Sequence, residues 1–179
     1  MHDLQEILSA MAAQRDRVPD RRELLLDMGD RIVKTASQRF HCKQDEVAIL
    51  LLSADGKHLR FVAPRGLADL GSIPVTKRDA IAVGVLTRRT GEVSNAVPTV
   101  KHVSFFESIK LRDKVAPIQK MVTTPILLEG RAIGVAQVSR KGENPREAGP
   151  DFTAADLNAA QEMFDATAPY LWAARPTSF

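Results

Sequence analysis

The side chains suited to covalent or metal chemistry are few in this 179-residue chain. Cys42 is the sole cysteine, so the chain can form neither an internal disulfide nor a metal site built from several cysteines. The histidines, at positions 2, 41, 58 and 102, lack the spacing typical of metal ligands. We find no serine–histidine–aspartate arrangement and no phosphate-binding loop motif. The residues therefore predict a protein that is not an enzyme, with no metal and no cofactor.

The side chains that can contact a small molecule are amides, hydroxyls and apolar groups in the second half of the chain. Amide and hydroxyl groups recognise the polar edges of a ligand, and a phenylalanine ring can stack on a planar group. Our candidates for ligand binding are Asn95, Ser104, Phe105, Phe106, Thr124, Ile133 and Gln137. Packing is the alternative for each of them: Thr124 precedes a proline, and Gln137 can satisfy buried backbone groups. Because few polar groups fix a ligand, we expect about two or three of these residues to contact it.

A β-hairpin predicted over residues 120–141 carries three of these candidates. Two runs rich in β-branched and aliphatic residues flank Glu129-Gly130, a two-residue turn whose glycine can adopt a positive φ. Alternation gives the second run two different faces. One face carries the small residues Ala132, Gly134, Ala136 and Val138, and the other carries Ile133, Val135, Gln137 and Ser139. We expect helices to pack on the small face, and the other face to form the floor of a ligand pocket.

Apolar periodicity and capping residues predict four helices. Two cover residues 3–17 and 21–39, the second capped by Asp20, and a third covers 78–89, where Gly91 ends it. The last begins after Thr153, with Asp156 completing a capping box. Pro169 lies within this last helix and should kink or shorten it.

Strand patterns fill the first half of the chain between these helices. Residues 46–53 and 58–63 are expected to pair across the turn Asp55-Gly56. Short extended pieces follow over 72–75, kept at a sheet edge by Pro74, and over 92–95. Residues 96–119 are a long irregular connection, which is typical of a functional loop.

This order of elements predicts an α+β fold, with a central antiparallel sheet, helices on one face and a ligand loop on the other. We divide the chain into an N-terminal helical extension (1–19), one domain (20–174) and a short tail (175–179). The apolar stripe of the first helix, formed by Leu4, Ile7, Leu8 and Met11, must be buried. It either covers the core of its own chain or pairs with a copy of itself in a homodimer.

Composition excludes several functional classes. Hydrophobic residues make up 44% and charged residues 26%, as in ordinary globular domains. The net charge is only +3 and no basic stripe is interleaved with aromatics, so we expect no nucleic-acid partner. No apolar run approaches the ~20 residues of a membrane span, and the N-terminus does not resemble a secretory signal. We therefore expect a cytoplasmic protein with no membrane partner.

The chain resembles a GAF domain over about residues 22–174, that is, the sensory module found in phosphodiesterases, phytochromes and bacterial regulators. Three pieces carry the resemblance in the family's order. They are Ile73-Pro74-Val75 with the helix from Ala80 and Thr90-Gly91-Glu92; Pro125-Ile126 with Gly130 to Val135; and Phe152 to Leu157. The resemblance implies a GAF/PAS-like fold and a stand-alone bacterial sensor.

A fourth piece, residues 134–141, is similar to the GAF domains of cyclic-nucleotide phosphodiesterases. Lys141, Phe152 and Asp156 match that subgroup's structural motif, whose lysine and aspartate brace the fold by pairing. Arg140 and Leu157 depart from it, as do Ala80 and Val83, which replace the family's small, flexible residues around the middle helix. The resemblance therefore implies the fold more specifically than it implies a cyclic nucleotide.

The resemblance implies a module that binds a small molecule and signals through its terminal helices as a homodimer. The alternative is a ligand-free dimerisation or scaffold module, favoured by the bulk of Val83. Some GAF domains instead reduce free methionine sulfoxide with cysteines in the pocket loops. Cys42 precedes the first strand and lies away from residues 96–119, so that activity and bilin attachment are not expected.

Overall fold

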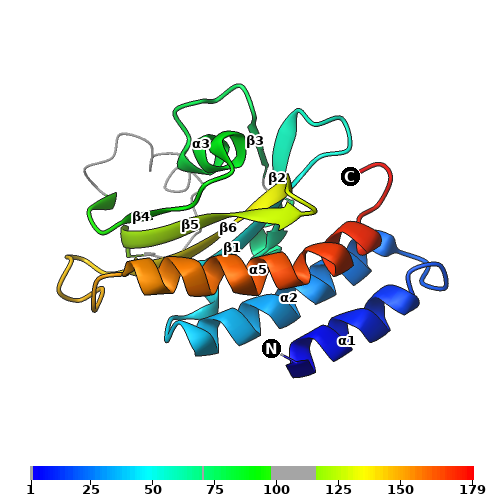
Figure 1. The fold of residues 1–179 in the computed structure, drawn as a ribbon, viewed down its shortest axis with the longest axis horizontal. Coiled ribbons are helices and arrows are strands. Elements are labelled where there is room, and N and C mark those ends of the chain that lie inside the picture. Colours follow the sequence, from blue (N-terminus) through cyan, green and yellow to red (C-terminus); the bar gives the residue numbers. More distant parts are fainter. Residues whose placement is uncertain (1, 70, 98–115) are drawn as a thin grey trace.

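The computed structural model describes residues 2–69, 71–97 and 116–179, which form a layered α+β fold (Figure 1). Its described strands make one sheet in the order β3-β2-β1-β6-β5-β4, and every pairing in it is antiparallel. The strands are β1 (Val47–Leu52), β2 (His58–Ala63), β3 (Ser72–Pro74), β4 (Glu92–Ser94), β5 (Ile118–Leu128) and β6 (Arg131–Lys141). The predicted hairpin thus provides two inner strands, and β3, with its proline, lies at an edge as expected.

Helices cover the two faces of the sheet unequally (Figure 1). Three long helices lie on one face: α1 (His2–Ala13), α2 (Arg21–Arg39) and α5 (Ala154–Ala174). The short helix α3 (Ile81–Arg88) lies on the other face, against β5 and β6. Two 3-10 turns, η1 (Gln44–Glu46) and η2 (Arg65–Leu67), flank the β1–β2 pair. This arrangement confirms the predicted fold class.

No helix in the described part of the chain is long and apolar enough to cross a membrane.

The sheet separates two apolar cores. The larger one, the helix-side core, joins α1, α2 and α5 to one face of the sheet, with Met28, Ile32 and Phe164 fully buried. The smaller one, the α3-side core, joins α3 to the opposite face through residues such as Val83, Val85 and Val135. Burial of such side chains stabilises the fold by roughly 1.5–3 kcal/mol each.

The first helix packs on its own chain. Leu4 and Leu8 are buried in the helix-side core, where α1 lies against α2 and α5. Ile7 remains 40% exposed and is the one large hydrophobic residue that stands out on the surface of the described residues. Of the two alternatives for this stripe, the structure therefore shows burial within the chain.

The hairpin has the predicted turn but an unpredicted bulge. Glu129 and Gly130 both adopt positive φ, 51° and 76°, as a tight turn of this type requires. The register then shifts from Ile126 opposite Gly134 to Leu127 opposite Ala132, so Ile133 is an extra residue in β6. The bulge places Ile133 in the helix-side core together with Ala136 and Val138. Our prediction that Ile133 shares a face with Val135 and Gln137 is wrong, because a bulge interrupts the alternation on which it rested.

The helix ends are formed partly as predicted. Asp20 caps α2 by accepting hydrogen bonds from the N–H groups of Arg22 and Glu23, and Thr153 forms the expected capping box with Asp156. Pro169 does not shorten α5, which continues to Ala174 while neighbouring side chains are buried in the helix-side core.

Gly91 has a different role from the one predicted, because α3 ends earlier, at Arg88, with Arg89 in the left-handed region (φ 55°). A Cβ on Gly91 would lie 2.7 Å from Leu157 Cδ1 and 3.0 Å from Thr123 O. Gly91 is therefore needed for close packing against α5 and β5.

Candidate functional site

A buried polar pair lies on the α3 side of the sheet. Gln137 in β6 and Thr123 in β5 are cross-strand partners, exposed by only 3% and 1%. Gln137 Nε2 donates a hydrogen bond to Thr123 Oγ1 at 3.3 Å. Val135, two residues along β6, belongs to the α3-side core, so the pair continues the sheet face that α3 covers. We call Thr123, Val135 and Gln137 the sheet floor.

Thr123 belongs to the sheet floor, but our sequence analysis did not name it as a candidate for ligand binding. We named Thr124 instead, but the structure places Thr124 on the opposite face of the sheet from Gln137. Successive residues of a strand point to opposite faces, so Thr124 faces the helices. Its hydroxyl donates a hydrogen bond to the side chain of Gln161 in α5, and Thr124 is 1% exposed. In a hairpin with this turn and no bulge, Thr124 would share the face of Gln137; the bulge at Ile133 shifts the register by one residue and places Thr123 opposite Gln137 instead, so no signal in the sequence pointed to Thr123.

Asn95 uses both its amide nitrogen and its amide oxygen to bind the backbone. Its Nδ2 donates to Phe152 O and its Oδ1 accepts from Phe152 N, both at 2.9 Å. The side chain thus holds the end of β4 to the segment that precedes α5. The three other candidates in this region, Ser104, Phe105 and Phe106, lie outside the described residues.

The motif residues Lys141 and Asp156 do not pair with each other. Lys141 Nζ bonds Asp45 instead, at 2.8 Å to Oδ2 and 2.7 Å to the backbone oxygen. Asp156 accepts hydrogen bonds from Thr153 N and Oγ1, both at 2.7 Å. The predicted bridge is therefore wrong, because each charge has a nearer partner: η1 beside β6 for the lysine, and the capping residue for the aspartate.

Phe152 is a packing residue, as the motif implies. It is 3% exposed in the helix-side core. Arg140, which departs from the family pattern, places its guanidinium carbon 4.6 Å from the centre of the Phe152 ring. This cation–π contact connects the end of β6 to the start of α5, which is the connection that a Lys141–Asp156 pair was expected to make.

Cys42 is poorly suited to nucleophilic chemistry. Burial, followed by the negative charge of Glu46, raises the pKa of its thiol to about 11. The thiol is therefore protonated near neutral pH, whereas a nucleophilic cysteine needs a thiolate. Cys42 also packs against the helix-side core, on the opposite face of the sheet from Gln137. Within the described part of the chain, no three His, Cys, Asp or Glu residues cluster as metal ligands.

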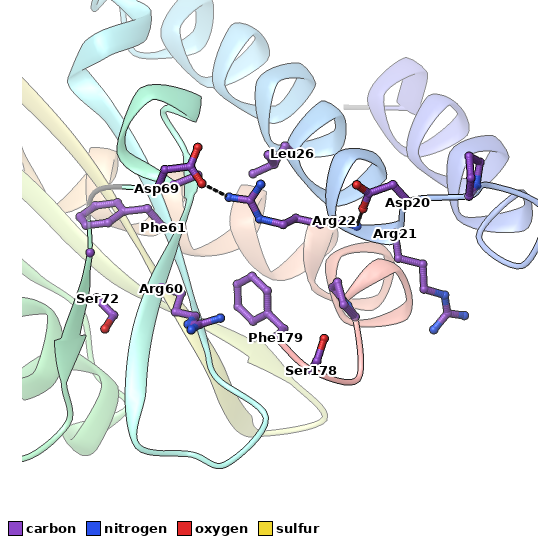
Figure 2. A pocket seen from close by; sticks show the side chains of 14 residues that line it. Asp20, Arg21, Arg22, Leu26, Arg60, Phe61, Asp69, Ser72, Ser178 and Phe179 are labelled. Carbon is purple, nitrogen blue, oxygen red and sulfur yellow. Dashed lines mark hydrogen bonds and ion pairs between the residues drawn. The ribbon is translucent and has the colours of Figure 1, made fainter.

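A cavity of about 630 Å³ lies away from the sheet floor, at the β2–β3 side of the molecule (Figure 2). Its walls come from the α1–α2 junction and the start of α2, from β2, from the segment that leads into β3, and from the C-terminal residues Pro176, Ser178 and Phe179. Sequence reasoning missed it because its walls are far apart in the chain.

Comparison with solved structures identifies the fold. No protein-family model matches the chain, and no curated protein matches it. Solved structures that are similar include residues 122 to 287 of a methyl-accepting chemotaxis protein, 18% identical with a TM-score of 0.63 over 92% of this chain and 96% of that one. The GAF domain of a phosphoenolpyruvate-protein phosphotransferase from Coxiella burnetii is 10% identical, with a TM-score of 0.63 over 96% and 94%. A free methionine-R-sulfoxide reductase from Neisseria meningitidis, solved with its substrate, is 16% identical, with a TM-score of 0.57 over 96% and 90%.

These likenesses, at low identity, show the fold. The chain has the GAF-domain fold, which confirms the resemblance in its sequence.

Proposed function

We propose that this chain is a sensory or regulatory module that binds a small polar molecule over the sheet floor. Binding would shift the sheet, and this conformational change would be passed to the terminal helices. The observation that carries the proposal is the buried Gln137–Thr123 pair on the sheet face away from the long helices. A buried amide costs free energy unless it is hydrogen-bonded, and apolar residues would pack this face at lower cost. The pair therefore favours recognition of a polar ligand over packing alone.

The chemistry of the pair indicates the kind of ligand. A glutamine amide has two N–H donors and a carbonyl acceptor, and a threonine hydroxyl can donate as well as accept. A planar group with adjacent donor and acceptor atoms suits such a pair, as in an amide or a nucleobase. A cyclic nucleotide remains one candidate within this class.

A route from the sheet floor to α5 supports the signalling part of the proposal. Thr123 faces the floor, and the next residue, Thr124, bonds Gln161 on α5. Gln161 Nε2 also donates to Pro125 O at 3.0 Å. A ligand that shifts β5 at Thr123 would act on α5 through these bonds, and α5 packs against α1 and α2. The solved GAF domain from a two-component sensor histidine kinase, 18% identical with a TM-score of 0.52, is a relative in fold with such a regulatory setting.

The second candidate function is a ligand-free scaffold module. Val83 favours it, because this residue is buried in the α3-side core with Val135 and fills space where the family has small residues. In that case the chain would act as a homodimer through its helices. An enzymatic role as a sulfoxide reductase is disfavoured by the protonated, displaced Cys42.

The test uses two neighbouring threonines as a matched pair. Thermal unfolding is measured with a panel of cyclic nucleotides, nucleotides, amino acids and methionine sulfoxide. A ligand at 100 times its Kd stabilises the folded chain by ~2.7 kcal/mol. We expect Thr123→Val to lose this stabilisation and Thr124→Val, an equal change on the opposite face, to retain it.

The same pair tests the signalling route. With a ligand found, hydrogen exchange of α5 should respond to it in the wild type but not in Thr124→Val. If no compound stabilises the wild type and the chain is a dimer on sizing, the scaffold function replaces the sensor.

A further inference from the structure

The 630 Å³ cavity has the size of a small-molecule site, since ligand pockets measure roughly 300–1,000 Å³. Arg60 of β2 and Phe179 near it stand at its centre in Figure 2, with the start of α2 on one side and β3 on the other. β1 separates β2 from β6, which carries Gln137. The cavity is therefore a second location, separate from the sheet floor.

Arg60 is the cation of this cavity that has no carboxylate to neutralise it. Arg21 pairs with Asp16 at 2.7 Å, and Arg22 pairs with Asp69 across the cavity at 2.5 Å. Arg60 forms no ion pair with any described residue, and its guanidinium carbon lies 5.8 Å from the centre of the Phe179 ring. The acidic side chains of the cavity have other partners and do not compete with an anionic ligand for Arg60. Asp20 caps α2, and Asp69 binds Arg22.

Two hydroxyl groups add uncommitted donors. Ser72 in β3 and Ser178 in the C-terminal segment both line the cavity. Neither hydroxyl forms a hydrogen bond within the part of the chain that the structure describes. A guanidinium with two hydroxyls is a donor set suited to a phosphate or carboxylate group.

The remaining wall is apolar. Pro19, Pro176 and Phe179 line the cavity beside these donors. Aromatic and proline rings offer flat apolar surfaces, against which a planar group packs. The cavity thus combines one unpaired cation with an apolar wall.

The walls are held in place by contacts within the chain. The C-terminal segment is fixed by the hydrogen bonds from Ala54 N to Phe179 O (2.7 Å) and from Arg175 Nη1 to Leu52 O (2.8 Å).

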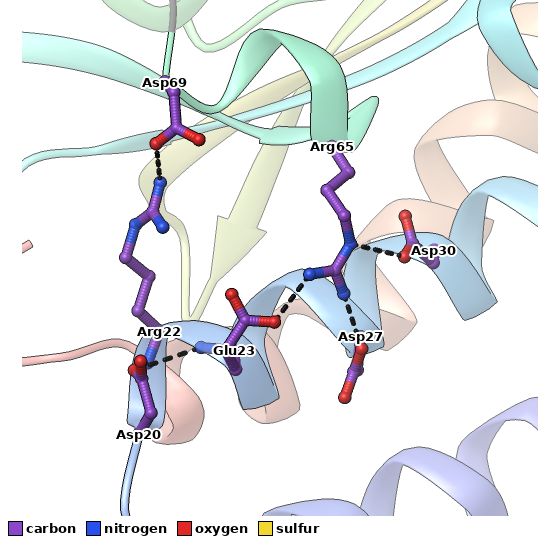
Figure 3. A network of polar contacts seen from close by, with 7 residues as sticks. All are labelled: Asp20, Arg22, Glu23, Asp27, Asp30, Arg65 and Asp69. Carbon is purple, nitrogen blue, oxygen red and sulfur yellow. Dashed lines mark hydrogen bonds and ion pairs between the residues drawn. The ribbon is translucent and has the colours of Figure 1, made fainter.

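The segment after β2 is fixed to α2 by Arg65, which bonds three carboxylates of that helix (Figure 3). These are Glu23, Asp27 and Asp30. A preformed site of this kind loses little conformational entropy when a ligand binds.

We propose that this cavity binds a small organic anion with a planar ring, its phosphate or carboxylate on Arg60 and its ring against Phe179. Phenyl phosphate is the probe, with inorganic phosphate lacking the ring and phenol lacking the charge. Titration by NMR or calorimetry should show phenyl phosphate binding more tightly than either fragment. Binding should weaken as salt is raised, because the contact is ionic and partly exposed.

Two arginine variants locate the site. Arg60→Ala should weaken phenyl phosphate binding roughly tenfold or more, as expected for loss of a charge-assisted hydrogen bond. Arg31→Ala removes an equal charge from an exposed position of α2 outside the cavity and should leave binding unchanged. Thr123→Val should also leave it unchanged, which separates this site from the sheet floor.

Three outcomes would overturn the proposal. They are no binding of phenyl phosphate to the wild type at millimolar concentration, equal weakening by Arg60→Ala and Arg31→Ala, and phenol binding as tightly as phenyl phosphate. A normal unfolding curve for Arg60→Ala ensures that a loss of binding is not a loss of fold.

Discussion

Asn95 and Phe152 exchange two hydrogen bonds although 57 positions separate them in the chain. The amide of Asn95 meets both the N–H and the C=O of Phe152, as a neighbouring strand would. The contact joins the end of β4 to the residue before the Thr153 cap, so it sets where α5 begins relative to the sheet edge. A residue that we selected for ligand binding is therefore occupied with positioning a helix.

Replacing Asn95 should destabilise the fold. Asn95→Ala removes both bonds and leaves the N–H and C=O of Phe152 without this partner, which costs about 1–3 kcal/mol. Urea unfolding measures the difference. Asn158→Ala, at an exposed position of α5, is the control and should be neutral or slightly stabilising. Equal stability of the two variants would show that the Asn95 contact contributes nothing.

Gly134 should tolerate no side chain. It lies opposite Leu51 at the centre of the sheet, and a Cβ there would lie 2.3 Å from the Leu50 backbone oxygen. Because backbone blocks the space, Gly134→Ala should cost about 1–3 kcal/mol or more. Gly66→Ala is the matched control, since nothing lies within 4 Å of its added Cβ. Circular dichroism melts of the two variants should differ clearly; coinciding melts would contradict the packing seen at Gly134.

The sequence predicted those elements whose signals are local. The Glu129-Gly130 turn, the Asp20 cap and the Thr153 capping box each depend on residues a few positions apart. The faces of the hairpin were harder, because one bulged residue, Ile133, reverses the alternation beyond it. The alternating pattern alone also does not show which of two adjacent threonines faces the helices. We chose Thr124 for the ligand-binding face of the sheet, but Thr123 lies on that face.

Contacts between distant segments could not be predicted. The Lys141–Asp156 pair followed from a family motif, but the actual partner of Lys141 depends on η1 folding beside β6. The cavity around Arg60 needs residues from both ends of the chain, and no pattern in the sequence connects Arg60 to Phe179.

Cys42 should react slowly with thiol reagents. With a pKa of about 11 against an ordinary value of 9.0, its thiolate fraction near pH 8 is about 100-fold lower than that of an unshifted thiol. A more basic thiolate is also more nucleophilic, which offsets part of this factor, so reaction with a disulfide reagent should be roughly tenfold or more slower in the folded chain than in urea. Burial slows the reaction further. Comparable rates in both states would show an accessible thiolate, and would reopen the sulfoxide-reductase function.

Asp156 should make the stability of the chain depend on pH. Hydrogen bonds from Thr153 hold the pKa of Asp156 below its ordinary value. A carboxyl group whose pKa is lowered by folding stabilises the folded chain above its unfolded pKa, near 3.9, and loses that effect as the pH falls through the folded value. Asp156→Ala should thus cost about 0.5–1 kcal/mol at pH 7, and the difference from wild type should shrink below about pH 4.

Urea unfolding at pH 7 and pH 3 measures this difference. Glu162→Ala removes an exposed carboxylate from the same helix without touching the cap, so it controls for the change in net charge. If Asp156→Ala costs as much at pH 3 as at pH 7, the ionised carboxylate is not what stabilises the start of α5. The cost would then come from a property of the Asp156 side chain that does not depend on its charge, because the hydrogen bond from Asp156 N to Thr153 Oγ1 is kept in Asp156→Ala.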